Sequence, residues 1–197
     1  MPGTLTIITG PMKSGKTTET LRKMYIEAKT GFNVIYLNSK TDTRTDGEFS
    51  THNPLYKEKF EKMDNVTFYS IDSLPGFSIF LDASSIYFDE VQFWKEDDAT
   101  VISFIMTLVE GMGKNVIVSG LASNWLRQKW GPISALEPFC DNYIRLTSLC
   151  DSCATEGKKE KAIFSLKIAG ELVKEQVGGA ETYDAVCRKC YIKRRDS

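Results

Sequence analysis

Several features that assign a chain to a large functional class are missing from this sequence. Its 197 residues carry a formal net charge of −1, so there is no overall basic field to recruit nucleic acid or an anionic membrane. No apolar run reaches about 18 residues, the length that a membrane-spanning helix needs. The opening residues, MPGTLTIITG, lack the basic start of a secretory signal peptide. We therefore expect a cytoplasmic protein that binds neither nucleic acid nor membranes.

Histidine is also nearly absent, which limits the chemistry open to the chain. The single histidine, His52, has no partner at metal-ligand spacing and lies in a polar, turn-rich stretch over residues 39–54. We predict that His52 is a loop residue, with a catalytic role as the alternative.

Cysteine is scarce but strongly patterned. Four of the five cysteines form two C-x-x-C pairs with 33 residues between them: Cys150 and Cys153, then Cys187 and Cys190. Two such pairs are typical of a tetrahedral four-cysteine zinc site, in which each pair holds one side of the metal. No open coordination position is implied, so we predict structural zinc; free thiols or a redox pair are the alternatives. Cys140 lies outside the pattern and is predicted to be a small buried apolar residue.

The apolar pattern predicts an α/β fold. Short β-branched runs, each typical of a buried strand, alternate with segments of helical periodicity. Strands are expected at 4–8, 33–38, 65–71, 85–90 and 115–120, and helices at 15–29 and 97–111. This alternation favours a mostly parallel sheet with helices on its faces. The composition changes near residue 148, so we expect a nucleotide-binding domain over 1–147 and a small cysteine-bearing domain over 148–193.

The stretch GPMKSGKTTE, at residues 10–19, predicts a phosphate-binding loop between a strand and a helix. The pattern G-x-x-x-x-G-K-[ST] is matched in full by Gly10, Gly15, Lys16 and Thr17, and the loop is completed by Pro11, Met12, Lys13 and Ser14. Glycine permits close backbone approach, so that successive N–H groups cradle phosphate oxygens. Lys16 would reach the β- and γ-phosphates, and Thr17 would bind Mg²⁺. A glycine turn without a ligand is the alternative.

Two neighbouring acids, Asp89 and Glu90, follow the apolar run IYF. An acid at the end of such a strand is where a phosphate-binding loop needs a Mg²⁺ ligand, so we predict that Asp89 faces the metal. Neighbouring side chains of a strand point to opposite faces, so Glu90 can share the site only where the chain turns out of the strand. There it would act as the base that takes a proton from an attacking hydroxyl, or would orient water in an ATPase. The alternative for Asp89 is a structural role, as an acidic cap at the end of the strand.

Aromatic residues gather in GLASNWLRQKWGP, at 120–132, directly after an expected strand. Trp125 and Trp130 bracket Arg127 and Lys129, and rings so placed can stack on a nucleobase. Core packing under a loop is the alternative for each ring.

Taken together, these features resemble the zinc-containing thymidine kinases, the cellular and viral type in which a P-loop domain is joined to a zinc-bearing lasso. The resemblance spans about residues 4–192, and its segments occur in the family's order: GPMKSGKTTE, KTDTR (40–44), FDEVQFW (88–94), GLASNWLRQKWGPI (120–133) and, across the cysteine pairs, GGAETYDAVCRKC. It implies a P-loop NTPase-like sheet with a small zinc-binding module held by four cysteines, and a homotetramer or dimer. It also implies transfer of the γ-phosphate of Mg·ATP to the 5′-hydroxyl of thymidine.

The resemblance assigns roles to individual positions. For catalysis it implies Glu90 as base, with Lys16 and Arg44 at the phosphates. For ATP and Mg²⁺ it adds Asp42, Asp89 and Gln92 to the loop Gly10, Pro11, Met12, Lys13, Ser14, Gly15, Lys16 and Thr17. For the nucleoside it implies Met12, Phe93, Leu121, Trp125, Trp130, Ser165, Gln176, Val177, Gly178 and Tyr183.

The chain departs from the family pattern at several of these positions. Lys13 stands where the family often has phenylalanine, and Ala122 replaces the usual acid after GL. Trp125 and Trp130 replace smaller aromatic residues, and Ser165 has one methyl group fewer than the usual threonine. A methyl group is worth about 1 kcal/mol, so these changes would alter the preference between thymidine and deoxyuridine by a modest factor.

Thymidine kinase activity in deoxynucleotide salvage is therefore the expectation. A P-loop ATPase of DNA metabolism is one alternative, and it would hydrolyse ATP without a nucleoside acceptor. A zinc-ribbon nucleic-acid-binding protein is the other, and it would show salt-dependent binding.

Overall fold

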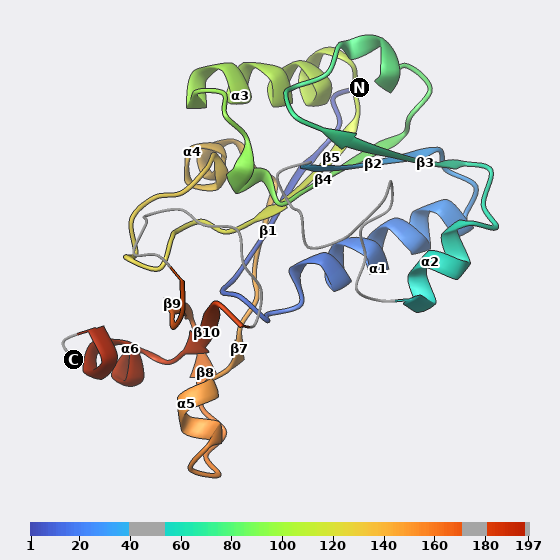
Figure 1. The fold of residues 1–197 in the computed structure, drawn as a ribbon. Helices are drawn as coiled ribbons and strands as arrows, with labels where there is room; N and C mark the ends of the chain where they lie inside the picture. Colours follow the sequence, from blue (N-terminus) through green and yellow to red (C-terminus); the bar gives the residue numbers. More distant parts are fainter. Residues whose placement is uncertain (40–53, 171–180, 196–197) are drawn as a thin grey trace.

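The computed structural model describes residues 1–39, 54–170 and 181–195. Its centre is a six-stranded sheet in the order β3-β2-β4-β5-β1-β6, in which every neighbouring pair is parallel (Figure 1). The strands are β1 (Leu5–Thr9), β2 (Val34–Ser39), β3 (Val66–Ile71), β4 (Ser85–Asp89), β5 (Asn115–Gly120) and β6 (Asn142–Arg145). The α/β class expected from the alternating pattern is confirmed.

Both faces of this sheet are buried, since the central strands β1, β4 and β5 are buried at almost every position. Successive side chains of β4 enter opposite layers: Ile86 and Phe88 pack in one apolar cluster and Tyr87 in the other. In β1 the same alternation places Ile7 and Ile8 in different clusters. The sheet therefore separates two cores and needs a helical layer on each side.

Helices supply these two layers (Figure 1). One face is covered by α1 (Lys16–Lys29) and α2 (Pro54–Phe60). The other is covered by η1 (Phe77–Phe80), α3 (Asp98–Met106), its π-helical continuation η3 (Thr107–Gly111) and α4 (Ile133–Leu136). The short turns η2 (Val91–Phe93) and η4 (Glu137–Phe139) link strands to these layers.

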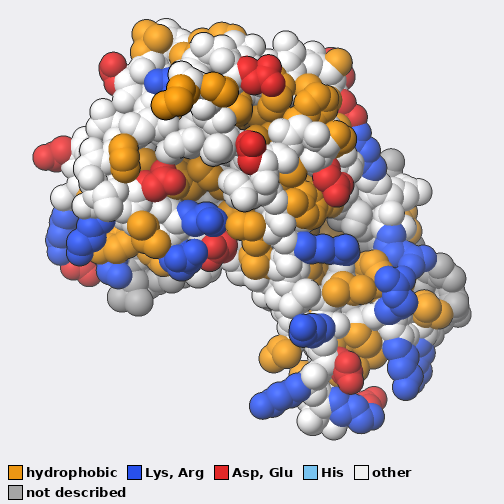
Figure 2. Space-filling model, turned by 180° about the vertical axis from the view of Figure 1, so that it is seen from behind, with side chains coloured by type: hydrophobic (Ala, Val, Ile, Leu, Met, Phe, Trp, Pro, Cys, Tyr) orange, Lys and Arg blue, Asp and Glu red, His pale blue; other side chains and the backbone are white. Residues whose placement is uncertain are grey.

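A second, smaller unit carries the cysteine pairs, and we call it the cysteine module. It contains two antiparallel ladders, β7 (Ser148–Leu149) with β8 (Lys161–Ala162) and β9 (Phe164–Lys167) with β10 (Tyr183–Val186), and the helices α5 (Asp151–Ala154) and α6 (Arg188–Arg195). It projects from the main body, and Lys and Arg side chains gather on it (Figure 2). Its first strand begins three residues after β6 ends; the division at 147/148 stays a prediction.

The strands expected from sequence are present within one residue at each end. The helix expected at 15–29 is also present, whereas the one expected at 97–111 changes to a π-helical turn after Met106. Sequence analysis missed β6, because Asn142–Arg145 is short and mostly exposed. It also missed α2, which begins at Pro54, the last residue of the stretch expected to be a loop.

Candidate active site

The candidate site lies where three neighbouring strands of the sheet end. The loop 10–15 follows β1, the acids follow β4, and the aromatic segment 120–132 follows β5. Since β4, β5 and β1 are adjacent and parallel, their carboxyl ends lie at the same edge, where open α/β sheets bind ligands. The cysteine module lies below this edge, next to the end of β1 (Figure 1).

The phosphate-binding loop has the shape that its glycines predict. Gly15 has φ 79°, a left-handed conformation that favours glycine, and α1 begins at the next residue. A Cβ at Gly10 would lie 2.6 Å from the Ser14 Oγ and 2.7 Å from the Leu146 carbonyl oxygen. The Lys16 ammonium is buried and donates to the Pro11 carbonyl at 3.0 Å, so it lies across the loop. The N-terminus of α1 and this lysine offer the N–H groups and the positive charge that an anion site needs.

Asp89 is buried at the end of β4 and is surrounded by hydroxyl groups. Ser119 Oγ donates to its Oδ1 at 2.6 Å, and Tyr36 Oη donates to its Oδ2 at 2.9 Å. Burial raises the pKa of Asp89 and the charge of Glu90 adds to this, while hydrogen bonds from Ser119, Thr17 and Tyr36 act in the opposite direction. The Asp89 carboxylate therefore lies beside the Thr17 hydroxyl, and these are oxygen ligands of the kind that Mg²⁺ prefers.

Glu90 lies where the chain leaves the sheet, as a shared acid pair requires. Its φ of 55° and ψ of 39° are left-handed, which is uncommon for a residue other than glycine. The Gln92 side-chain amide donates to the Glu90 carboxylate, and the Gln92 Oε1 accepts from the Leu121 N–H at 3.0 Å. The Gln92 side chain therefore faces Glu90 and the strand end, and it holds the carboxylate in place from there.

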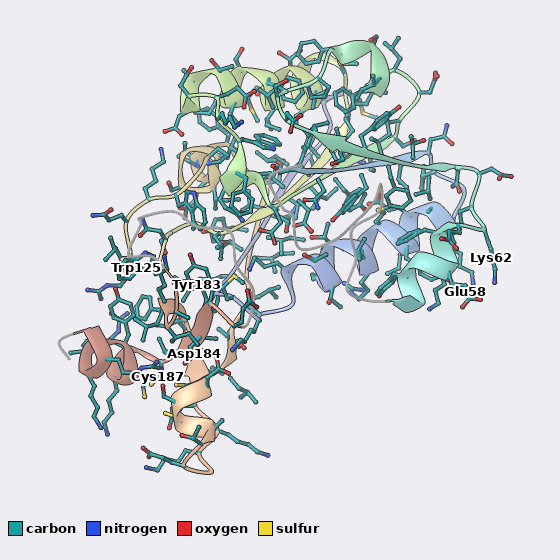
Figure 3. All side chains as sticks on the ribbon, viewed as in Figure 1. Glu58, Lys62, Trp125, Tyr183, Asp184 and Cys187 are labelled. Atoms are coloured by element: carbon teal, nitrogen blue, oxygen red, sulfur yellow. The ribbon has the colours of Figure 1, made fainter. Side chains whose placement is uncertain are left out.

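A pocket opens beside Glu90, and its lining is mostly aromatic and apolar. Seven residues implied for the nucleoside line it: Met12, Phe93, Leu121, Trp125, Trp130, Ser165 and Tyr183. Phe93 and Trp130 meet edge to face with ring centroids 5.4 Å apart. Figure 3 shows Trp125 and Tyr183 approaching each other from the main body and the cysteine module. Trp130 is buried and also lines the pocket, so its stacking on a base stays a prediction.

The pocket also contains two residues that sequence analysis missed, Ser123 and Asn124. Asn124 is 3% exposed, and its Oδ1 accepts from the Leu126 and Gln128 N–H groups, each at 3.0 Å. This fixes the amide orientation, and its Nδ2 is buried without an acceptor in the part of the chain that is described. Asparagine is frequent in turns for backbone capping alone, so the sequence carried no signal that would have marked it as a pocket residue.

Two residues of the phosphate loop contact the cysteine module. The Met12 N–H donates to the Ser165 Oγ at 2.9 Å. The Lys13 ammonium points away from the loop and pairs with Asp151 at 2.8 Å and Asp184 at 3.5 Å. Burial lowers the pKa of Lys13, but the hydrogen bonds and charges of these two acids outweigh it and raise the pKa. Only the Lys13 backbone is thus left to face phosphate.

The cysteine pairs form a compact cluster. All four Sγ atoms lie within 4.8 Å of one another, and that of Cys153 lies 3.9 Å from that of Cys187 and 3.5 Å from that of Cys190. A tetrahedral site with Zn–S bonds of about 2.3 Å needs sulfur separations of about 3.8 Å, so the cluster fits zinc. The fifth cysteine, Cys140, was predicted to be buried but is half-exposed, with its thiol donating to the Glu137 carbonyl at 3.1 Å.

Other residues singled out from the sequence lie outside the described part of the chain. They are Asp42, Arg44, His52, Gln176, Val177 and Gly178.

Comparison with known proteins gives one consistent family. A sequence model described as "Thymidine kinase" matches residues 3–191. "Thymidine kinase a" of Arabidopsis thaliana is 33% identical over 96% of this chain and 75% of its own length. "Thymidine kinase" of Raccoon poxvirus is 32% identical over 96% of this chain and 97% of its own.

A solved structure shares the fold. The crystal structure of the flagellar accessory protein FlaH from Methanocaldococcus jannaschii covers 75% of this chain and 72% of its own, with a TM-score of 0.53 and 16% identity. Within the described residues, no helix is long and apolar enough to span a membrane.

Proposed function

The chain belongs to the thymidine kinase family, and we propose that it transfers the γ-phosphate of ATP to the 5′-hydroxyl of thymidine, giving dTMP and ADP. The observation that carries the proposal is the position of Glu90. Glu90 lines an aromatic and apolar pocket that Met12 of the phosphate loop also lines. A base at that position lies between an acceptor and a phosphate donor.

The phosphate side of the reaction would be carried by the loop after β1. Backbone N–H groups of the loop and the N-terminus of α1 would hold the phosphates, with the Lys16 ammonium moving from the Pro11 carbonyl to the β- and γ-oxygens. Thr17 and Asp89 would hold Mg²⁺, which when bound offsets the charge of the phosphates. Its positive charge would also keep Asp89 ionised against the effect of burial.

The acceptor side would be carried by Glu90 and Gln92. Glu90 would accept the proton of the 5′-hydroxyl as the oxygen attacks the γ-phosphorus. Gln92, held by the Leu121 N–H, would keep the Glu90 carboxylate in place beside the hydroxyl. Gln92 would thus position the base, and the cofactor contact that the resemblance implies for it stays a prediction.

The nucleoside base would lie among the aromatic rings. Phe93 and Trp130 fix each other edge to face, and Trp125 and Tyr183 close the pocket from the two sides of the module boundary. Burial of a base against such rings excludes water, which favours transfer to the sugar over hydrolysis. An enzyme that only hydrolysed ATP would have no use for this pocket, and that supports the kinase over the ATPase. The lasso residues Gln176, Val177 and Gly178 remain proposed contacts of the nucleoside.

Labelled Mg·ATP tests the proposal directly. The protein would be incubated with thymidine, deoxyuridine, deoxycytidine and purine deoxynucleosides, and ATP hydrolysis would be followed in parallel. We expect label on thymidine, with deoxyuridine as a weaker acceptor. Hydrolysis without a labelled nucleoside would refute the kinase and favour the ATPase.

Glu90→Gln tests the base. The substitution keeps the shape of the side chain but removes its basicity, so kcat should fall by roughly 100-fold or more while thymidine still binds. Isothermal titration with thymidine would serve as the control for folding and binding. Near-normal turnover would exclude Glu90 as the base.

Three further properties belong to the same proposal. Structural zinc in the four-cysteine cluster is testable by metal analysis of the purified protein, with one equivalent expected. The homotetramer or dimer implied by the resemblance is testable by sedimentation. Cytoplasmic localisation and a role in nucleotide salvage follow from the family and are testable in cells.

A further inference from the structure

We propose that the two cysteine pairs position the two walls of the nucleoside pocket, the first pair through Asp151 and the second through Tyr191. The inference rests on the proposed function, since it concerns the binding of thymidine. It assigns the four-cysteine cluster a role in substrate affinity beyond holding the cysteine module together.

The second cysteine pair is followed directly by Tyr191. This tyrosine is 1% exposed and packs in the apolar cluster of the cysteine module beside Cys187 and Cys190. Its N–H donates to the Cys187 carbonyl at 2.9 Å, which ties its backbone to a cysteine of the cluster. Its hydroxyl donates to the Trp125 carbonyl at 2.8 Å, across a sequence separation of 66 residues. The side chain therefore reaches from the cysteine cluster to the backbone of a pocket residue.

Arg127 strengthens the same contact. Its guanidinium lies over the Tyr191 ring, 4.7 Å from the centroid, and 5.6 Å from that of Phe164. Its φ is 61°, a left-handed conformation that is unfavourable for a residue other than glycine and persists only when the surroundings impose it. The turn that carries Trp125 is thus held against the cysteine module at two neighbouring points.

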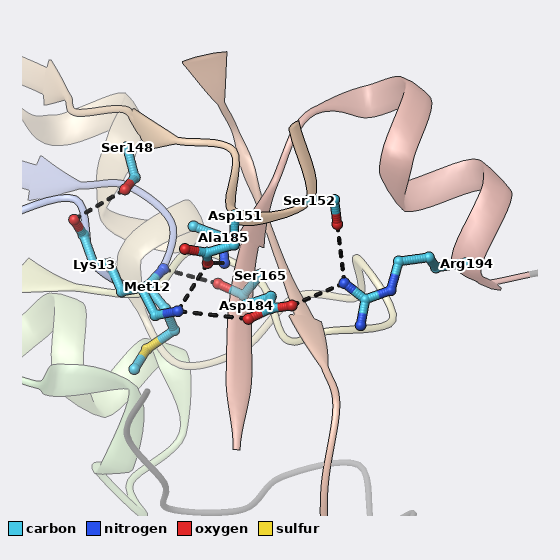
Figure 4. Close-up of polar contacts among 9 residues, drawn as sticks. All are labelled: Met12, Lys13, Ser148, Asp151, Ser152, Ser165, Asp184, Ala185 and Arg194. Carbon is cyan, nitrogen blue, oxygen red and sulfur yellow. Dashed lines mark hydrogen bonds and ion pairs between the residues drawn. The ribbon is translucent and has the colours of Figure 1, made fainter. Parts of the chain in front are cut away.

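The first cysteine pair contains Asp151, which joins the cluster to the phosphate loop (Figure 4). Its Oδ2 accepts from the Ala185 N–H at 2.7 Å and pairs with the Lys13 ammonium at 2.8 Å. Lys13 also reaches Asp184, which is held in turn by Arg194 at 2.8 Å. The loop residue before Lys13 is Met12, which lines the pocket, so this ion-pair network fixes a wall of it.

Both contacts depend on the arrangement of the cysteines. With zinc bound, the four thiolates fix the separation of α5 from α6, and thereby the separation of Asp151 from Tyr191. Without the metal, this separation is set by packing of a small cluster and by the hydrogen bond from Arg194 to the Ser152 Oγ at 3.0 Å. Zinc and thymidine should therefore favour each other's binding, and the coupling must be equal in both directions.

Tyr191→Phe is the first test. The substitution keeps the ring and its packing but removes the Tyr191 donor from the part-buried Trp125 carbonyl, so the KM for thymidine should rise roughly 5- to 10-fold. The KM for ATP and kcat should change less than about twofold, a pattern that general loss of stability would not produce. Tyr69→Phe, on the exposed edge strand β3, is the matched control and should change neither constant.

Zinc affinity is the second test, with a readout independent of turnover. The apparent zinc dissociation constant of the unmodified protein would be measured by competition with a chromogenic chelator, with and without saturating thymidine. We expect thymidine to tighten zinc binding several-fold, and this effect to shrink in Tyr191→Phe. If Tyr191→Phe fails to fold, Arg127→Met, at an exposed position, is the second variant. Asp151→Asn tests the contact between the first cysteine pair and Lys13.

The outcomes are distinguishable. An unmodified protein that phosphorylates no nucleoside refutes the proposed function. If the unmodified protein turns over thymidine, two results would each overturn the coupling and leave the kinase intact. One is an unchanged KM for thymidine in both Tyr191→Phe and Arg127→Met. The other is a zinc affinity that thymidine does not change.

Discussion

Gly120, the last residue of β5, lies against the side chain that positions the proposed base. A Cβ added there would lie 2.6 Å from the Gln92 Oε1, 3.1 Å from the Val91 Cγ2 and 3.3 Å from the Val91 nitrogen. Carbon atoms in proteins pack at about 3.5–4.0 Å, so Gly120→Ala must displace the Gln92 amide by roughly 0.5–1 Å. The φ of Gly120 lies outside the left-handed region, so alanine adds crowding without backbone strain.

The expected magnitude follows from what Gln92 contacts. Its amide cannot keep both the Leu121 N–H and the Glu90 carboxylate once it moves, and a displacement of about 1 Å in a catalytic group costs on the order of 100-fold in rate. We therefore expect kcat to fall between about 10- and 100-fold. Overpacking of this kind lowers the free energy of unfolding by about 1–3 kcal/mol, which leaves the protein folded at 25 °C.

Steady-state kinetics with thymidine and ATP, together with thermal unfolding, measure both effects. Gly76→Ala is the matched control, because a Cβ at Gly76 would meet only the Ser78 Oγ at 3.9 Å. It should leave kcat and the unfolding midpoint near their original values. If Gly120→Ala kept kcat within about twofold of the unmodified protein, the positioning role of Gln92 would be refuted.

The remaining predictions concern the metals and the pocket. Asp89→Asn should raise the Mg²⁺ concentration for half-maximal rate about 10-fold or more, and an unchanged Mg²⁺ titration would remove Asp89 from the metal site. Trp130→Ala deletes a ring that is 7% exposed, so we expect urea titration to show a free energy of unfolding lower by about 3–5 kcal/mol. Thymidine binding should also weaken, which calorimetry measures. Cys153→Ser should lower the zinc content below one equivalent by elemental analysis, since a tetrahedral site loses one of four ligands.

Much of the fold was predictable because it depends on local pattern. The strands β1, β4 and β5 each carry a short apolar run, and a phosphate-loop pattern between the first of them and a helix permits few arrangements. The spacing of the cysteine pairs likewise predicted a cluster that the structure brings together. By contrast, β6 depends on pairing with β1 and has no buried face of its own to mark it in the sequence.

The site was less predictable where side-chain direction decides function. Lys13 belongs to the phosphate loop in sequence, but its φ of 61° turns the side chain toward the cysteine module. The hydrogen bonds that join Gln92 to Glu90 and Leu121 could not be read from the sequence, and its expected contact with the cofactor stays a prediction. Nothing in the sequence marks Tyr191 beyond its position after Cys190. Its partner is the backbone carbonyl of Trp125, which lies in the other predicted domain, 1–147.

The position of β1 in the sheet has a consequence for the order of events during synthesis. β1 pairs with β5 and β6, and the contacts that join it to them span 111 and 136 residues. During synthesis β1 leaves the ribosome long before β5 or β6. Its apolar side chains therefore stay unpaired with the sheet until most of the chain is made. The loop that would hold ATP is therefore encoded early but completed late, and a truncated chain ending before β5 would have no assembled nucleotide site.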